Sequence, residues 1–152
     1  MRETPRLPVF VVDASVATKW YLLDEEDTRA ADAVLADFRE GRILLVAPDH
    51  IRYEVASAIQ NAYRTNRLTN DQAQRATAEF LSWHIPKASG DDLILAAREA
   101  AIRFGCSFYD GLYVALAESA GCPLIFADRR LRNTLGGQFG HALWLTDYAT
   151  IA

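Results

Sequence analysis

Short apolar runs, separated by longer segments of helical periodicity, define the pattern of this chain. Residues 9–12 and 124–127 are wholly apolar, and each run ends directly in an aspartate, Asp13 and Asp128. Apolar runs of this length are typical of strands buried on both faces, as in a parallel sheet. The carboxyl ends of parallel strands meet at one edge of a sheet, where open α/β proteins bind their ligands. The pattern therefore predicts a carboxylate site at that edge.

Apolar residues recur with helical spacing in most of the remaining chain, for example at Ile51, Val55 and Ile59. Thr69 and Gln72 have the spacing of a capping box at the start of a helix. In chain order, helices are expected at residues 15–22, 28–39, 49–64, 70–85, 93–104, 109–120 and 129–135, and two further strands at residues 43–46 and 143–145. Strands that alternate with helices predict an α/β fold, with a parallel sheet covered by helices on both faces.

Length and composition bound the class of protein. With 152 residues and no internal repeat or linker-like segment, the chain is expected to form a single domain over residues 1–152. Hydrophobic residues make up 51% and charged residues 24%, as in an ordinary globular protein. The net charge of −4 argues against a protein that binds nucleic acid through a passive basic surface. It does not exclude an enzyme that reaches phosphate groups through a bound cation.

The two cysteines and the absence of targeting signals indicate a cytoplasmic protein. Cys106 and Cys122 lie beside apolar residues and form no C-x-x-C motif, so we expect two buried, reduced thiols. The apolar stretch at residues 7–12 is too short for a signal peptide, and no run is long enough to cross a membrane.

Two further acids stand among apolar residues. Glu54 borders the apolar stripe of its expected helix, next to Val55, and Asp110 shares a helix face with Tyr113. Acidic side chains are almost never buried unless they are paired or bound to a metal. Two other readings stay open: Glu54 could lie half-exposed at the edge of the stripe, and Asp110 could cap its helix or pair with an arginine.

If Asp13, Glu54, Asp110 and Asp128 converge, their mutual repulsion requires a cation among them. Carboxylate oxygens favour Mg²⁺ or Mn²⁺ over zinc, and we expect Asp13, Asp110 and Asp128 to bind the metal. Such ions make a bound water acidic and stabilise charge on a phosphodiester, so no nucleophilic side chain is needed. The sequence contains neither a nucleophile elbow nor a phosphate-binding P-loop.

Cations follow two of the acids. Lys19 lies about two helical turns after Asp13, and Arg129 and Arg130 follow Asp128 directly. They could hold substrate phosphates, although charges on a solvated helix surface explain them equally well.

Other polar clusters are expected to have no part in this site. The four consecutive acids at residues 24–27 fit a solvated helix N-terminus. The three histidines, at positions 50, 84 and 141, lack metal-ligand spacing and are expected to be exposed or hydrogen-bonded.

Four blocks of the sequence, taken in order, resemble the PIN-domain ribonucleases, and most of all the VapC toxins of VapBC toxin–antitoxin pairs. The blocks are Asp13-Ala14-Ser15-Val16 followed by Lys19-Trp20, Glu54-Val55 after Pro48, Ser107-Phe108-Tyr109-Asp110-Gly111-Leu112-Tyr113-Val114-Ala115-Leu116-Ala117, and Ala127-Asp128-Arg129-Arg130-Leu131. The resemblance covers nearly the whole chain.

The resemblance implies a three-layer α/β/α fold and an endoribonuclease that depends on Mg²⁺ or Mn²⁺. It implies that Asp13, Glu54, Asp110 and Asp128 form the acidic quartet and that Ser15 supports the site by hydrogen bonding. It also implies RNA as the substrate, a cognate antitoxin protein as the partner that restrains the activity, and a homodimer.

One position departs from the family pattern. Phe126 stands two residues before the last acid, where the family often has Ser or Thr. This keeps open a catalytically weak or inactive PIN-fold module that only binds protein or RNA. A receiver or phosphatase with a nucleophilic Asp13 is a further alternative, although Ser15 breaks the D-x-D motif of the phosphatases.

Overall fold

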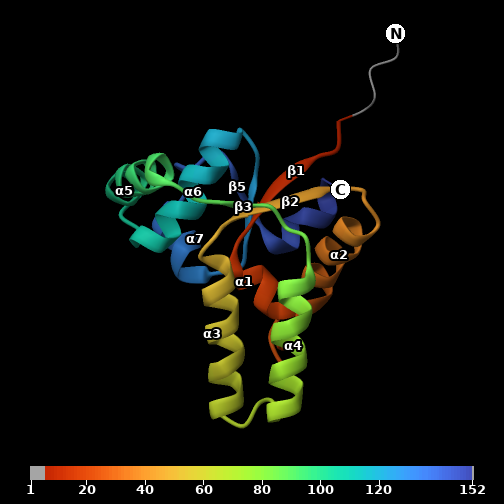
Figure 1. The fold of residues 1–152 in the computed structure, drawn as a ribbon. Coiled ribbons are helices and arrows are strands. Elements are labelled where there is room, and N and C mark those ends of the chain that lie inside the picture. Colours follow the sequence, from red (N-terminus) through yellow and green to blue (C-terminus); the bar gives the residue numbers. More distant parts are fainter. Residues whose placement is uncertain (1–5, 152) are drawn as a thin grey trace.

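The computed structural model describes residues 6–151 and has a five-stranded, entirely parallel sheet at its centre (Figure 1). The strands are β1 (Val9–Val12), β2 (Leu44–Pro48), β3 (Lys87–Ala88), β4 (Leu124–Phe126) and β5 (Ala142–Trp144), in the spatial order β3-β2-β1-β4-β5. Strand β1 is central, because Val11 is in register with Val46 on one side and with Leu124 on the other. This position explains why β1 and β4 are apolar on both faces.

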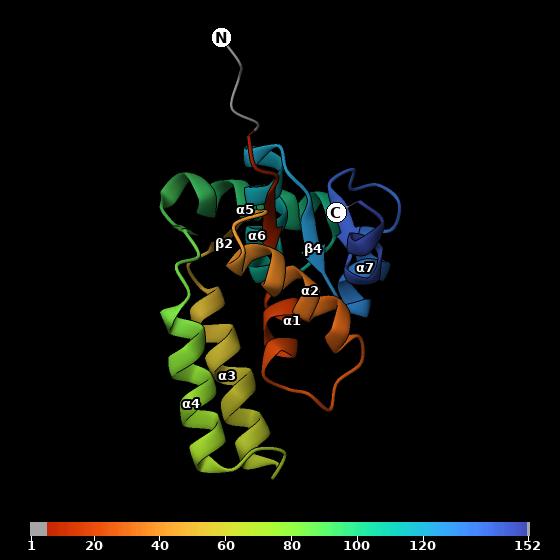
Figure 2. The ribbon, with the colours of Figure 1, turned by 90° about the vertical axis from the view of Figure 1, so that its right-hand side faces the viewer.

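Helices cover both faces of the sheet, which confirms the α/β prediction (Figures 1 and 2). Helices α5 (Asp91–Phe104) and α6 (Phe108–Ala120) lie on one face, and α2 (Thr28–Arg39) and the 3₁₀ helix η2 (Leu145–Thr150) lie on the other. The remaining helices are α1 (Ala14–Ala17), the 3₁₀ helix η1 (Thr18–Trp20), α3 (Ile51–Arg64), α4 (Asn70–Ser82) and α7 (Arg129–Leu135). Helices α3 and α4 form a hairpin that projects below the sheet in Figure 1.

Close packing holds α6 against α5. Gly111 of α6 lies so near α5 that a Cβ atom there would stand 2.4 Å from the carbonyl oxygen of Ala97. Only glycine permits this approach without a shift of one helix. The contact matters for function because the neighbouring residue, Asp110, is one of the predicted site residues.

Most of the expected elements are present, with corrections near their ends. The expected helix at residues 15–22 is wrong in extent, because α1 ends at Ala17 and tightens into η1. Strand β3 was not predicted, since it has two half-buried residues and no periodic pattern. The capping box of α4 is confirmed: Thr69 and Gln72 exchange both hydrogen bonds.

The acids at residues 24–27 lie at the N-terminus of α2 and are mostly exposed, as expected, but they also make ion pairs that were not predicted. Asp27 has a left-handed backbone, with φ of 59°, and makes no capping hydrogen bond. The other three acids form ion pairs with cations that follow or precede them at a distance in the sequence: Asp24 and Glu25 with Arg67, Glu25 also with Lys19, and Glu26 with Arg129. These pairs fasten the loop before α2 to η1, to the loop between α3 and α4, and to α7.

Cys122 is buried as expected, whereas Cys106 is only half-buried, and the two thiols are free. Among residues 6–151, no helix combines the length and apolar character that a membrane crossing requires.

Candidate active site

The four predicted acids all stand at helix N-termini on the carboxyl edge of the sheet. Asp13 follows β1 and caps α1, and Asp128 follows β4 and caps α7. Glu54 and Asp110 lie in the first turns of α3 and α6. The backbone N–H of Asp13 donates to the carbonyl of Ile125 at 3.0 Å, so the two strand ends are joined at this point. The partial positive charge of each helix N-terminus favours a carboxylate there.

Asp13 is the most deeply placed of the four acids, with 6% of its surface exposed. Its Oδ2 accepts the backbone N–H of Ser15 at 3.0 Å, and no Lys or Arg of the described residues forms an ion pair with it. Burial raises the pKa of Asp13 to about 7, and the charges of Glu54 and Asp110 push it in the same direction. A buried carboxyl group in this state gains most from a cation brought beside it.

Asp110 is coupled to the other acids as well. Its pKa is raised, first by burial and then by the charges of Asp128 and Glu54, while Ser107 and Arg130 oppose the rise. Asp128 accepts the backbone N–H of Leu131 at its Oδ1, at 3.1 Å. The structure therefore brings Asp13, Glu54, Asp110 and Asp128 into one electrostatic neighbourhood.

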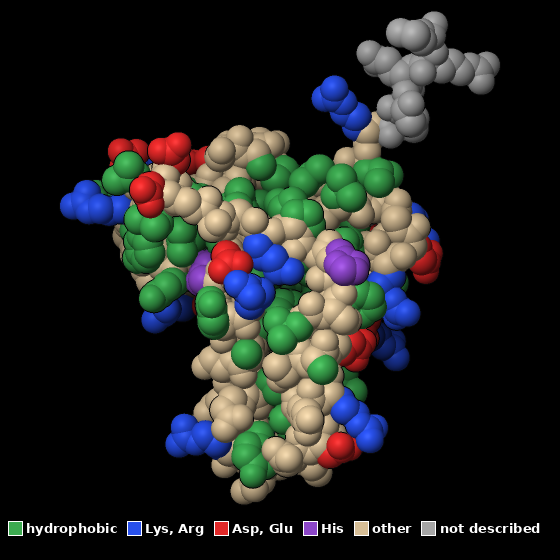
Figure 3. Space-filling model, viewed as in Figure 1, with side chains coloured by type: hydrophobic (Ala, Val, Ile, Leu, Met, Phe, Trp, Pro, Cys, Tyr) green, Lys and Arg blue, Asp and Glu red, His purple; other side chains and the backbone are tan. Residues whose placement is uncertain are grey.

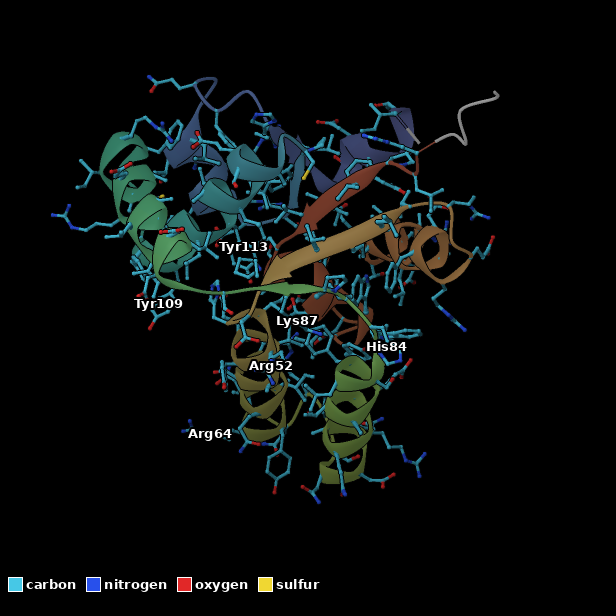
Figure 4. The ribbon with its side chains drawn as sticks, turned by 45° about the horizontal axis from the view of Figure 1, so that its top comes forward. Arg52, Arg64, His84, Lys87, Tyr109 and Tyr113 are labelled. Carbon is cyan, nitrogen blue, oxygen red and sulfur yellow. The ribbon has the colours of Figure 1, made fainter. Side chains whose placement is uncertain are left out.

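Glu54 is held by Tyr113, a residue that the sequence placed on the same helix face as Asp110 but without a role in the site. The hydroxyl of Tyr113, which is fully buried in α6, donates to Glu54 Oε1 at 2.8 Å. Burial and the charges of Asp13 and Glu54 raise the pKa of Tyr113 well above its usual value, so the hydroxyl keeps its proton. In Figure 4, Tyr113 lies close to the sheet while Tyr109, one turn earlier, lies at the outer end of α6. The signal was present as the i+3 spacing from Asp110.

His50 corrects the expectation that each histidine is exposed or hydrogen-bonded. Its Nε2 lies 2.6 Å from Glu54 Oε1 but without hydrogen-bond geometry, and both ring nitrogens are buried without a partner within the described residues. The ring packs between Tyr109 and Tyr113, with centroid distances of 5.4 Å and 4.8 Å. The i, i+4 spacing to Glu54 was the available signal.

Ser15 and Lys19, which were predicted to support the site and to hold substrate phosphate, are both engaged in hydrogen bonds within the protein. The hydroxyl of Ser15 accepts the N–H of Ala127 at 2.8 Å, which ties α1 to the end of β4. The buried ammonium of Lys19 donates to the carbonyl of Glu26 at 2.9 Å and lies 3.4 Å from Glu25.

The two arginines after Asp128 have different surroundings. Arg129 pairs with Glu26 at 2.6 Å, and both side chains are exposed. Arg130 acts electrostatically on Asp110 and forms no ion pair in the part of the chain that the structure describes. Arg130 is therefore the cation beside the acids that remains available.

Phe126 takes no part in the site. It is 2% exposed and packs edge-on against Trp144 of β5, with ring centroids 5.3 Å apart. Asp128 lies beyond the end of β4 and is oriented by its own hydrogen bond from the backbone N–H of Leu131. Ser15 of α1 supplies a hydroxyl to the same end of β4.

The donor set fits a hard divalent ion in its chemistry. All four side chains offer carboxylate oxygens, which Mg²⁺ and Mn²⁺ prefer. Glu54 Oε2 and Asp128 Oδ2 accept no hydrogen bond from other residues in the range 6–151. Within that range no three His, Cys, Asp or Glu side chains converge as a closed cage for a metal. The carboxylates are thus close enough to affect one another's charge but do not converge on a single coordination centre.

Comparison with known proteins gives a consistent result. Residues 10–135 match the family model described as PIN domain. Ribonuclease VapC3 from Pyrobaculum aerophilum is 34% identical over 125 residues, which cover 80% of this chain and 90% of the relative. Ribonuclease VapC12 from Mycobacterium tuberculosis is 32% identical over 128 residues, which cover 84% and 93%.

Two solved structures share the fold. PAE2754 from Pyrobaculum aerophilum superimposes with a TM-score of 0.69 at 23% identity, over 96% of this chain and 97% of its own. VapC20 from Mycobacterium tuberculosis, described as a sarcin–ricin loop cleaving toxin, gives a TM-score of 0.62 at 19% identity, over 82% and 93%.

Proposed function

We propose that this chain, which belongs to the PIN-domain family and within it to the VapC ribonucleases, is a metal-dependent endoribonuclease acting as the toxin of a toxin–antitoxin pair. The observation that carries the proposal is Asp13, a buried carboxyl group with a raised pKa beside three further acids. We further propose that residues 1–152 act as one PIN domain.

The metal would be Mg²⁺ or Mn²⁺, held by Asp13, Asp110 and Asp128. When bound, such an ion makes water acidic and stabilises charge that develops on a phosphodiester. Glu54 would accept the proton of the attacking water at Oε2, because Tyr113 already occupies Oε1. The Tyr113 hydroxyl keeps the Glu54 carboxylate in a fixed orientation for this task.

Substrate phosphates would be held by the cations that follow Asp128. Arg130 stands near Asp110 and is unpaired within the described residues, so we propose it as the first phosphate contact. Arg129 would exchange Glu26 for phosphate, since that ion pair is exposed and readily broken. Lys19 and Ser15 would support substrate binding indirectly, because Lys19 braces the loop at residues 25–26 and Ser15 braces the end of β4.

The partners would be RNA, a cognate antitoxin and a second copy of the chain. Exposed apolar side chains on one face of α5, Ile94, Leu95 and Ile102, offer a surface for the homodimer. Figure 3 shows hydrophobic side chains over this helix, at the left of the view. Sedimentation of the wild type and of a Leu95→Lys, Ile102→Lys double variant would test the dimer.

A catalytically inactive binding module remains the alternative that Phe126 suggested. No specific observation favours it, because Phe126 packs in the core. A phosphoaspartate enzyme is disfavoured by the depth of Asp13, which leaves little surface for an incoming phosphate.

The proposal is tested by incubating the purified chain with structured RNAs in Mg²⁺, in Mn²⁺ and in EDTA, and mapping the cut ends. We expect cleavage with either ion, none in EDTA, and none from Asp13→Asn or Asp110→Asn. Asp71→Asn is the matched control, since Asp71 is an exposed acid in the first turn of α4. Equal cleavage by wild type and Asp13→Asn would refute the assignment.

A further inference from the structure

An open groove of about 700 Å³ lies directly beside Glu54. Its walls come from two elements, the outer face of α3 and the first turn of α6. Tyr53, Ser57 and Asn61 follow each other at intervals of four residues, so they form one stripe along α3. Tyr109 of α6 contributes from the other side. The groove therefore leads away from the acidic cluster along α3.

The groove exposes flat aromatic surface to solvent. Tyr53 is 67% exposed and Tyr109 is 60% exposed, although both rings are large and apolar. The partly buried ring of His50, which also lines the groove, packs on Tyr109 at 5.4 Å with a tilt of 31°. Figure 4 shows Tyr109 at the outer end of its helix, away from the core. Tyr109 is thus held in place from within while its outer surface stays open.

The lining favours an uncharged, planar group over a phosphate, because most of its side chains are aromatic or neutral and its one imidazole, His50, stands beside the carboxylate of Glu54. No Lys or Arg lines the groove among the described residues, and its only carboxylate is Glu54. The amide of Asn61 and the hydroxyl of Ser57 can each donate and accept hydrogen bonds. Aromatic faces next to such groups match an unpaired nucleic-acid base, which stacks by its face and is recognised along its edge. A base within a duplex has both faces covered and does not fit.

We propose that this groove binds one unpaired base of the RNA, next to the phosphate that is cleaved. This inference rests on the proposed function and deepens it, because it assigns the recognition of one unpaired base to named side chains of α3 and α6. Tyr53 and Tyr109 stack on the base, and Asn61 and Ser57 contact its edge. The charged backbone then passes over the acidic cluster and Arg130.

The test measures binding separately from cleavage. Tyr53→Ala and Tyr109→Ala are combined with Asp13→Asn, which blocks cleavage, and titrated in Mg²⁺ with a short single-stranded RNA carrying 2-aminopurine. Stacking on tyrosine quenches this base. We expect each alanine variant to weaken binding by about tenfold or more and to abolish the quench, whereas Tyr53→Phe and Tyr109→Phe keep both.

Tyr63→Ala is the matched control, because Tyr63 is an exposed tyrosine of α3 that lies outside the groove. It should bind and quench like the parent protein. A duplex of the same sequence should bind more weakly than the single strand and show no quench.

The outcomes separate the two proposals. If the wild type cleaves RNA but the Tyr53 and Tyr109 variants bind and quench normally, only the groove inference is overturned. If the wild type cleaves no RNA in either metal, the proposed function fails. Sedimentation of the alanine variants checks the dimer. If their weaker RNA binding coincides with dissociation of the dimer, or if only their affinity for the antitoxin falls, the groove is a protein interface and the base site is overturned.

Discussion

The hydroxyl of Tyr113 donates a 2.8 Å hydrogen bond to Glu54, joining a buried residue of α6 to a half-exposed residue of α3. The bond crosses 59 residues of sequence. It occupies one carboxylate oxygen of Glu54, while the other accepts no hydrogen bond from residues 6–151. Since Tyr113 is fully buried, packing fixes the position of its hydroxyl, and the hydrogen bond in turn fixes the orientation of the Glu54 carboxylate.

We expect Tyr113→Phe to lower kcat for RNA cleavage by about fivefold while KM changes little, because one hydrogen bond contributes about 1 kcal/mol. The matched control is Tyr148→Phe. Tyr148 is equally buried and its hydroxyl bonds to Asp37 Oδ2 at 2.5 Å, on the opposite side of the sheet. That variant should lose stability but keep kcat. A parallel loss of kcat in both variants would show that Tyr113 acts through stability alone.

The stability of the metal-free protein should depend on the ionisation of Asp13. Its folded pKa of about 7 lies above the unfolded value of 3.8, so the folded state binds more protons between these two values. The free energy of unfolding therefore falls as pH rises from about 4 to 7, by roughly 4 kcal/mol at most, and levels off above that. Urea unfolding in EDTA at pH 5 and pH 8 measures it. Asp13→Asn should flatten the difference, and an unchanged slope would contradict the assignment.

A bound metal ion should restore the stability that the protein loses when Asp13 ionises. We expect Mg²⁺ or Mn²⁺ to raise the melting temperature at pH 8 more than at pH 5, because protons and metal compete for the same carboxylates. Asp110→Asn should reduce the shift and Asp71→Asn should not. Calorimetric titration gives the affinity directly. A shift of equal size in Asp110→Asn would place the metal elsewhere.

The parts of the molecule that could be predicted are those encoded by local patterns. The strands around residues 9–12 and 124–126 are apolar because they are central, and the capping box at Thr69 is written in adjacent residues. The shared location of Asp13 and Asp128 could also be predicted, because a parallel sheet brings the carboxyl ends of its strands to one edge.

What escaped prediction depends on partners that are distant in sequence. The ion pairs of residues 24–26 reach Arg67 and Arg129, and nothing near the acids identifies those partners. The role of Tyr113 requires knowledge that α6 packs over the start of α3. His50 was expected to be exposed or hydrogen-bonded, yet it is enclosed by two tyrosines from another helix.

Gly111→Ala should destabilise the domain by about 1–3 kcal/mol, because the new methyl group would overlap the carbonyl oxygen of Ala97 and force α6 away from α5. The shift would also move Asp110, so activity should fall beyond the loss of folded protein. Gly137→Ala is the control, since its Cβ would meet no atom within 4 Å. Urea unfolding compares the two, and equal stability would show that α5 adjusts without cost.

Ser15→Ala should cost about 1–3 kcal/mol, because it leaves the backbone N–H of Ala127 without its acceptor at the end of β4. Asp128 follows directly after Ala127, so the same change should loosen the spacing between Asp13 and Asp128 and weaken Mn²⁺ binding. Thr134→Ala removes a hydroxyl that bonds only to its own exposed helix, at the carbonyl of Arg130, and should change neither property. Calorimetry and urea unfolding on both variants distinguish the effects. If Ser15→Ala lowers stability but leaves the metal affinity intact, Ser15 fastens α1 to β4 without setting the geometry of the acids.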